Sequence, residues 1–311
     1  MSKMSSAEAS AWAKSFFAKV YPEYLRVGPW HPVAKVSAAA LLLALAATRR
    51  KAFEADALDD LGDEEEDQEA SVVERRRQGA SRTQAPVSVL PPRALQAVRA
   101  IGALWGMSLL AVVVRAFGPW PLVTFTMQSW TMMTTRYVLG AIAPAESREA
   151  IVPRWRRAAI RLNEALRFPC LAQNSITLVV WWLALVPLMF TFMKDAKRRS
   201  NFWKFNARPV LFNVHVMNLP LAALDHFLNP RRLLPSDLWV GIASGVAYVS
   251  FYQAFLDRSG LQLYIILSPR TKLSLVTVAA FLGGYTMLYR LWDDVARSQL
   301  KKLSNGVKVD R

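Results

Sequence analysis

Two polar residues lie inside apolar stretches that are long enough to cross a membrane. Thr126 belongs to Thr-Phe-Thr-Met-Gln-Ser-Trp at 124–130, and His215 opens His-Val-Met-Asn-Leu-Pro at 215–220. An ionisable ring within a membrane span is costly, so it is by default a functional-site hypothesis. A hydroxyl and an imidazole are also the minimal pair for nucleophilic catalysis, because the base takes the proton as the oxygen attacks. We therefore take Thr126 as the candidate nucleophile and His215 as the candidate base.

The residues that follow Thr126 favour a polar pocket. Ser129 and Trp130 stand three and four residues later, so on a helix they share its face. Gln128 or Ser129 could donate a hydrogen bond to the oxyanion that forms when an ester carbonyl is attacked. A threonine in a membrane span is, however, most often bonded back to its own helix or packed at a helix contact.

The residues after His215 complete the candidate site. Asn218 lies three residues later and could orient the ring or donate to an oxyanion. Pro220 cannot donate to the carbonyl of Val216, which predicts a kink in this helix. Asp225 lies ten residues from His215, about 15 Å along a helix, so it is expected near the opposite interface. A histidine in a span is also commonly a hydrogen-bonded strut between helices.

The apolar residues come in blocks of about 20, the length that a hydrocarbon core of about 30 Å requires. Six blocks are predicted to span the membrane, at 98–117, 121–143, 173–193, 208–228, 238–257 and 272–292. Tryptophans at several borders match the aromatic belts of multi-pass proteins. Backbone groups in lipid must be satisfied internally, so the spans are helices. The sequence predicts an all-α polytopic transmembrane helical bundle with a six-helix core.

The two candidate residues have matching depths in the second and fourth spans. Thr126 stands six residues after Trp120 and His215 seven after Arg208, which places both about 9–11 Å below one surface. In a six-helix topology these two spans start from the same side. A contact between the two residues needs this matching depth.

The segments around the core differ in composition. The core covers 98–295, after an appendage at 1–51 and a linker at 52–97 whose acidic and basic runs predict disorder, and a basic tail follows at 296–311. Within the appendage, Val33–Thr48 is either a short seventh span or an interfacial or packed helix. The first 32 residues favour an interfacial amphipathic helix or an organellar targeting segment.

The formal charge of +16 comes from basic residues that cluster in loops at span borders, where they set orientation or meet anionic head groups. We therefore expect membrane lipids as partners and no nucleic acid, and the sequence names no protein partner for the N-terminal region. Loops on one side carry 21 Lys and Arg and those on the other side nine, which favours both core ends on the cytosolic side. The 194–208 loop, with six, argues against this topology. Arg136 lies closer to a span end and is expected to snorkel.

Cysteine and histidine are too scarce for a disulfide framework or a metal cluster. The chain has one cysteine, Cys170, and three histidines. No Gly-rich phosphate loop or metal-ligand motif occurs. We therefore expect no cofactor and no metal.

Several of these residues, taken with their positions in the spans, resemble the androgen-induced protein family, which includes the androgen-dependent regulator of tissue-factor pathway inhibitor. Phe-Thr at 125–126 resembles the segment that holds the family's nucleophilic threonine, although Thr124 competes for that match. His215, followed by Leu-Pro at 219–220 and by Asp225, looks like the family's catalytic-histidine segment.

A third segment, Gly-Leu-Gln-Leu-Tyr at 260–264, is similar to a Gly-x-Trp-x-Tyr-Pro stretch of that family. Gln262 stands in place of its tryptophan and Ile265 in place of its proline, and the first hundred residues have no counterpart. The resemblance covers about 98–295. It implies a six-helix threonine hydrolase that cleaves fatty acid esters of hydroxy fatty acids.

On this reading Thr126 attacks an acyl-ester substrate inside the bilayer and His215 is the base. The residues expected to bind substrate or support the site are Gln128, Ser129, Trp130, Asn218 and Tyr264. We expect an integral multi-pass protein of the endoplasmic reticulum or another endomembrane. The alternative is a non-catalytic membrane protein that binds lipid or serves as a scaffold subunit, with His215 as a structural strut.

Overall fold

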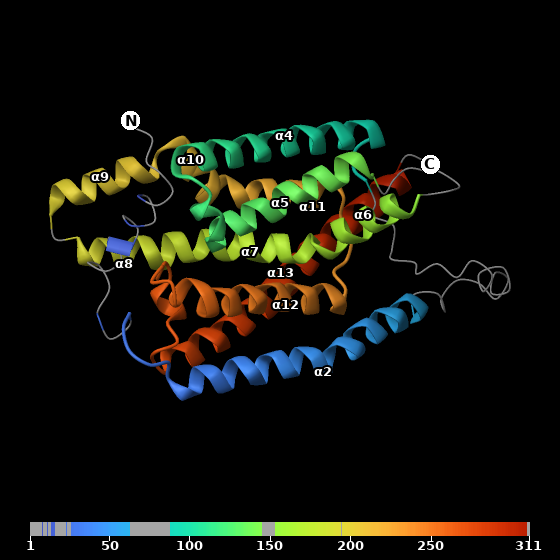
Figure 1. Cartoon of the computed structure of the whole chain (residues 1–311). Helices are drawn as coiled ribbons and strands as arrows, with labels where there is room; N and C mark the ends of the chain where they lie inside the picture. Colours follow the sequence, from blue (N-terminus) through green and yellow to red (C-terminus); the bar gives the residue numbers. More distant parts are fainter. Residues whose placement is uncertain are drawn as a thin grey trace.

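The computed structural model describes residues 8, 11, 14, 15, 23, 26–62, 88–144, 153–193 and 195–309. Within these ranges all regular structure is helical, which confirms the predicted all-α class (Figure 1). The α-helices are α2 (Pro32–Gly62), α4 (Pro92–Phe117), α5 (Phe125–Ile142), α6 (Arg154–Ala165), α7 (Arg167–Val179), α8 (Val186–Phe192), α9 (Ala196–Asn206), α10 (Pro209–Phe212), α11 (Asn218–Leu228), α12 (Pro235–Phe251) and α13 (Leu273–Val309). Two short 3-10 turns are η2 (Trp120–Val123) and η6 (Ile265–Leu267). Three π-helical segments are η3 (Val180–Leu185), η4 (Asn213–Met217) and η5 (Tyr252–Asp257) in the part of the chain that is described.

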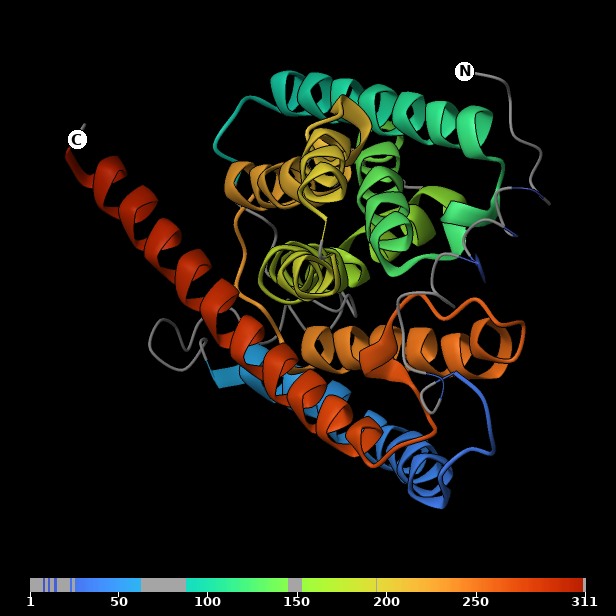
Figure 2. The ribbon, with the colours of Figure 1, turned by 90° about the vertical axis from the view of Figure 1, so that its left-hand side faces the viewer.

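Helix α7 lies at the centre of the bundle, as the view down the helices in Figure 2 shows. Helices α5 and α11 pack against one side of α7, and α12 and α13 pack against another. Helix α4 covers α5, and α2 lies outside α12 and α13. Every residue from Arg167 to Ser175 of α7 is buried, as a central position requires.

Six helical passes along the bundle form the core: α4, α5, α7–α8, α10–α11, α12 and α13. Helix α4 begins and α13 ends at the same end of the bundle (Figure 1). Among the described residues, five helical stretches are long and apolar enough to cross a membrane, and they lie in α2, α4, α6–α8, α12 and α13. This supports an integral multi-pass membrane protein. The remaining core passes, α5 and the run from α10 through η4 to α11, are not among these stretches, and they carry Thr126 and His215.

The apolar block predicted at Val33–Thr48 lies in α2, which runs the length of the bundle (Figure 1). Trp239 of α12 donates its Nε1 hydrogen to the Leu45 carbonyl at 2.9 Å. The Trp239 ring also meets Phe53 edge to face, with 6.0 Å between the ring centroids. Helix α2 is therefore packed on the core along both halves.

Two predicted boundaries differ from the structure. Helix α2 continues to Gly62, so the linker expected from residue 52 starts later, and 63–87 lie outside the described residues. Helix α13 continues through the predicted basic tail to Val309. Most of the first 25 residues, where an amphipathic or targeting segment is expected, also lie outside the described residues.

The segment before α2 is fastened to the connection between α12 and α13. The Gln262 side-chain amide donates to the Arg26 carbonyl at 2.7 Å. Trp30 donates its Nε1 hydrogen to the Asp257 carboxylate at 3.2 Å. Gln262, which departs from the resembling motif, therefore contacts the appendage that has no counterpart in that family.

Two Gly-x-x-x-Gly pairs let neighbouring helices approach closely, as small residues do in membrane bundles. Gly102 and Gly106 of α4 face α5, where Tyr137 and Thr134 occupy the space that a Cβ would need.

Gly241 and Gly245 of α12 form the second pair. Phe168 of α7 stands against Gly241, and the ring of Phe281 from α13 stands against Gly245. These contacts bring α12 close to both α7 and α13, which form the walls of the cavity described below.

The three π-helical segments gather at the end of the bundle where α5 and α13 begin. Segment η3 leads into α8, η4 follows α10 and η5 ends α12, and these helix ends lie together in Figure 1. The π-helical segment η4 precedes Pro220, where the sequence predicts a kink. Single π turns inside helices are frequent at functional sites.

Candidate functional site

An apolar cavity of about 290 Å³ lies between α5, α7, α12 and α13. It is closest to the end of the bundle where α5 and α13 begin, and we call this the cavity end. Its walls are mostly aliphatic and aromatic side chains. The lining residues with hydroxyl groups are Thr126, Ser175, Thr177, Tyr248, Tyr264 and Thr277.

Thr126 and Thr124, which compete as candidate nucleophiles, have different positions at the start of α5. Thr124 is the N-cap: its Oγ1 accepts from the Met127 N–H at 3.2 Å and donates to the Pro121 carbonyl at 2.8 Å. Capping therefore uses the Thr124 hydroxyl. Thr126, in the first turn of α5, lines the cavity.

Tyr264 is the direct polar neighbour of Thr126. Its phenol oxygen accepts from the Phe125 N–H at 3.1 Å, and its side chain lines the cavity together with Thr126. The Tyr252 hydroxyl holds the Tyr264 backbone, donating to its carbonyl at 3.1 Å and accepting from its N–H at 3.2 Å. Loss of solvation inside the protein raises the pKa of Tyr264, so the phenol keeps its proton and can donate.

His215 lies in η4 and is 5% exposed. Its Nδ1 is 3.2 Å from the Leu211 carbonyl oxygen, which can only accept a hydrogen bond. This contact assigns the proton of the neutral ring to Nδ1 and leaves Nε2 as the acceptor. A base that acts through Nε2 needs this tautomer.

Trp181 of η3 stands between His215 and the cavity. Its indole stacks on the imidazole with 3.7 Å between ring centroids and 10° between planes, and the same indole lines the cavity. His215 is not among the residues that line the cavity. The two candidate residues are therefore at the same end of the bundle, with Trp181 on the cavity side of the ring.

The other predicted neighbours of Thr126 take structural contacts. Ser129 donates its hydroxyl to the Thr126 carbonyl at 2.8 Å and lies 3.1 Å from the Thr177 hydroxyl. Trp130 donates to the Gly106 carbonyl at 3.2 Å, so its polar edge faces α4. Neither side chain lines the cavity, so Ser129 supports the wall from behind.

Gln128 and Asn218 also lie outside the cavity lining. Gln128 is half-buried on α5. Asn218 is fully buried, and its side-chain oxygen accepts from the Leu219 N–H at 2.8 Å. The His215 ring is instead oriented by the hydrogen bond that its Nδ1 donates to the Leu211 carbonyl.

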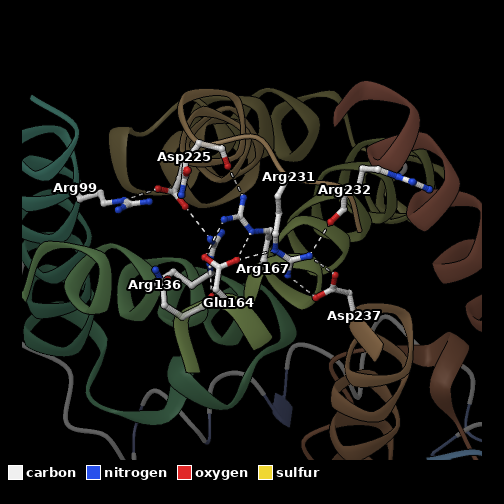
Figure 3. A network of polar contacts seen from close by, with 10 residues as sticks. Arg99, Arg136, Glu164, Arg167, Asp225, Arg231, Arg232 and Asp237 are labelled. Carbon is white, nitrogen blue, oxygen red and sulfur yellow. Dashed lines mark hydrogen bonds and ion pairs between the residues drawn. The ribbon is translucent and has the colours of Figure 1, made fainter. Parts of the chain in front are cut away.

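The opposite end of the bundle, where α4 and α12 begin, holds a buried ionic cluster (Figure 3), and we call it the ionic end. Asp225 of α11 pairs with Arg99 of α4 at 2.9 Å and with Arg136 of α5 at 2.8 Å. The expectation that Arg136 snorkels is wrong, because its side chain is 2% exposed and its Nε donates to the Asn163 carbonyl at 3.1 Å. Pairing with Asp225 offsets the cost of burial.

Arg231, in the connection between α11 and α12, joins the second half of this cluster. Its guanidinium donates to both oxygens of Asp237 at 2.7 and 2.8 Å and to Glu164 at 2.8 Å. Glu164 also pairs with Arg167 at 2.9 Å. Burial alone lowers the pKa of Arg231, but Asp237 and Glu164 raise it by more, so the guanidinium stays charged.

Trp181 is the site residue that the sequence analysis missed. Trp181 and Trp182 stand near the middle of the span predicted at 173–193, away from the borders where aromatic belts lie. That position was the available signal. The Trp182 Nε1 hydrogen is donated to the His215 carbonyl at 3.1 Å, so both indoles contact the histidine.

Comparison of the chain with family models, with curated proteins and with solved structures gives no match. The resemblance to the androgen-induced protein family therefore stays a prediction.

Proposed function

We propose that this membrane protein binds the acyl chain of a lipid in the cavity and hydrolyses a fatty acid ester at Thr126. The observation that carries the proposal is the position of one hydroxyl. Thr126 lines an apolar cavity within a membrane bundle, at the start of a helix and beside a protonated phenol.

The cavity supports an acyl chain as its occupant. Its volume of about 290 Å³ is near the lower end of small-molecule sites, which are about 300–1,000 Å³. Its lining is apolar apart from hydroxyls, most of which already bond to the protein. A long hydrocarbon group with one polar end matches these walls, with the polar end at Thr126 and Tyr264.

In the proposed reaction, Nε2 of His215 takes the hydroxyl proton of Thr126 while the threonine oxygen attacks the ester carbonyl. The Tyr264 phenol, which lines the cavity together with Thr126, is the donor that we assign to the oxyanion. Collapse of the tetrahedral intermediate breaks the ester C–O bond, and the alcohol leaves with the proton held by His215. Water, deprotonated by the same ring, then releases the fatty acid and restores Thr126.

A second candidate function is lipid binding without hydrolysis. One contact favours it: the His215 ring is covered by Trp181, which stands between the ring and the cavity. In this case Thr126 and Tyr264 hold the polar end of the lipid, and His215 is a strut.

The test for the nucleophile is labelling of the full chain in detergent by a fluorophosphonate, which reacts with activated hydroxyls. Thr126→Val keeps the branched shape and removes the oxygen, so it should abolish labelling and lower ester turnover by about 10³-fold or more. Thr277→Val is the matched control, because it lines the same cavity and its hydroxyl already donates to the Ile266 carbonyl. Labelling that persists in both Thr126→Val and Thr124→Ala refutes the nucleophile.

The two candidate functions separate at His215. We expect His215→Gln to abolish turnover with near-native stability if the protein is a hydrolase. A binding protein instead shows no wild-type turnover, and the same variant loses about 1–3 kcal/mol of unfolding free energy because a buried hydrogen-bonding group is replaced. Binding of a spin-labelled fatty acid to the wild type then measures the lipid site directly.

A further inference from the structure

The indole of Trp181 makes one hydrogen bond, to a residue of the surface helix α9. Its Nε1 hydrogen is donated to the side-chain oxygen of Asn206 at 3.0 Å. Asn206 ends α9 and is 4% exposed. Its amide nitrogen donates to the Phe202 carbonyl at 2.9 Å, so the oxygen is the atom left to accept from Trp181.

The two tryptophans of η3 have separate anchors. Trp182 is fixed by the His215 carbonyl and by stacking on Trp203 of α9, with 6.1 Å between ring centroids. Trp181 has the Asn206 bond, the stack on His215, and the cavity beside it. A side chain that borders a cavity has room to move that a close-packed side chain lacks.

We propose that Trp181 is a movable partition that controls access from the cavity to His215, and that Asn206 is the positioning residue that keeps the partition closed. In the closed arrangement the indole covers the imidazole. Release of the Asn206 bond lets the indole leave the ring, and Nε2 of His215 then faces the cavity that Thr126 lines.

This inference rests on the proposed function for its purpose, because a hydrolase needs the base and the nucleophile in one space. Its physical content is independent of turnover, because it concerns only whether the ring can be reached. Helix α9 lies beyond the core helices at the cavity end (Figure 1). The hydrogen bond between Asn206 and Trp181 therefore joins a surface helix to the interior.

The test measures acylation of histidine by diethyl pyrocarbonate on the full chain in detergent, read at each site by mass spectrometry. The chain has three histidines, which supply internal references. His31 is half-buried at the surface, and His226 is fully buried at the ionic end. In the wild type we expect His31 to react first and both His215 and His226 to be protected.

Asn206→Leu removes the acceptor, and Trp181→Phe keeps a stacked ring but removes the donor. Each should raise the reaction rate at His215 by about five- to tenfold, the shift in an opening equilibrium expected from loss of one hydrogen bond. The double variant should equal the single variants, because both remove the same bond. Trp181→Ala should expose His215 further.

Trp182→Phe is the matched control, because it loses the neighbouring indole donor to the His215 carbonyl and leaves the partition in place. Protection of His215 in Asn206→Leu and Trp181→Phe, with His226 also protected, overturns the proposal. The proposal is also overturned if the increases in reaction rate at His215 add up in the double variant. The same holds if Trp182→Phe raises that rate as much as Asn206→Leu does. If Trp181→Ala also exposes His226, that variant has lost its fold and the two conservative variants decide. Exposure of His215 without fluorophosphonate labelling keeps the partition and refutes the hydrolase.

Discussion

The two ends of the bundle bury polar groups by different physical means. At the ionic end, Asp225 bridges the guanidinium groups of Arg99 and Arg136, and Glu164 bridges those of Arg167 and Arg231. At the cavity end the polar groups that line the cavity are neutral hydroxyls, and Thr126 and Tyr264 make few bonds beside an apolar space. An ion pair at this end, Asp257 with Arg270, joins the end of α12 to the connection before α13 and does not line the cavity. The three π-helical segments of the described chain are at the cavity end alone.

This difference assigns the stability of the bundle and its candidate chemistry to opposite ends of the molecule. Separating charged pairs in a low dielectric costs much free energy. The ionic end therefore fixes α4, α5, α11 and α12 relative to one another. A cavity bounded by neutral groups and π turns leaves side chains that can change position. Stability is expected to depend on the ionic end, and ligand binding on the cavity end.

The strongest challenge to this comparison is Asp225→Asn. It places a neutral amide between the guanidinium groups of Arg99 and Arg136, and we expect a loss of about 3–5 kcal/mol of unfolding free energy. Denaturant titration in detergent measures it. Glu54→Gln is the control, because its pair with Arg50 is exposed and should cost under about 0.5 kcal/mol. Equal effects in the two variants would contradict the ionic end as the stabilising region.

Arg231→Lys keeps the positive charge at this position and removes the planar guanidinium that donates several hydrogen bonds. A lysine cannot donate to both Asp237 oxygens and to Glu164 with a planar fork. We expect a loss of about 1.5–3 kcal/mol of unfolding free energy, with binding of a spin-labelled fatty acid unchanged. Weakened lipid binding in this variant would show that the two ends are coupled.

Gly245→Ala tests the packing beside the cavity. The added methyl collides with the ring of Phe281, which also lines the cavity, so the ring must move. We expect a loss of about 1–3 kcal/mol and weaker binding of the spin-labelled fatty acid. Gly283→Ala on α13 is the control, because a Cβ there meets nothing within 4 Å and should stabilise the helix by up to about 1 kcal/mol. Unchanged lipid binding in Gly245→Ala would argue against this cavity as the lipid site.

The smallest effect is expected from Gln262→Leu, which removes the hydrogen bond to the Arg26 carbonyl. We expect a loss of about 0.5–1.5 kcal/mol of unfolding free energy. Faster proteolysis near residue 26, with the six core crossings intact, would locate the effect at the segment before α2. If Gln262→Leu loses more unfolding free energy than Arg231→Lys does, the cavity end contributes more to stability than the ionic end, against this comparison.

The order of the crossings was predictable because burial in lipid demands long apolar blocks. Counting residues along the helices also predicted that Thr126 and His215 lie at the same end of the bundle. It did not predict that Trp181 separates them, since Trp181 stacks on His215 and bonds to Asn206, 25 residues away. The pairs of Asp225 could not be read from one sequence either, because Arg99 is 126 residues distant and an arginine near a span end looks the same whether it snorkels or pairs.

Helix α2 runs beside the six-helix core from the cavity end to the ionic end (Figure 1). With α2 and all six core passes in the membrane, the number of passes is odd. In that topology we expect the segment around Trp30 and the last turns of α13 to face different compartments. An impermeant reagent added outside sealed vesicles would reach one of them and never both. A soluble factor that engages the segment around Trp30 would thus act from the compartment that borders the cavity end, while one that modifies Lys301 would act from the other.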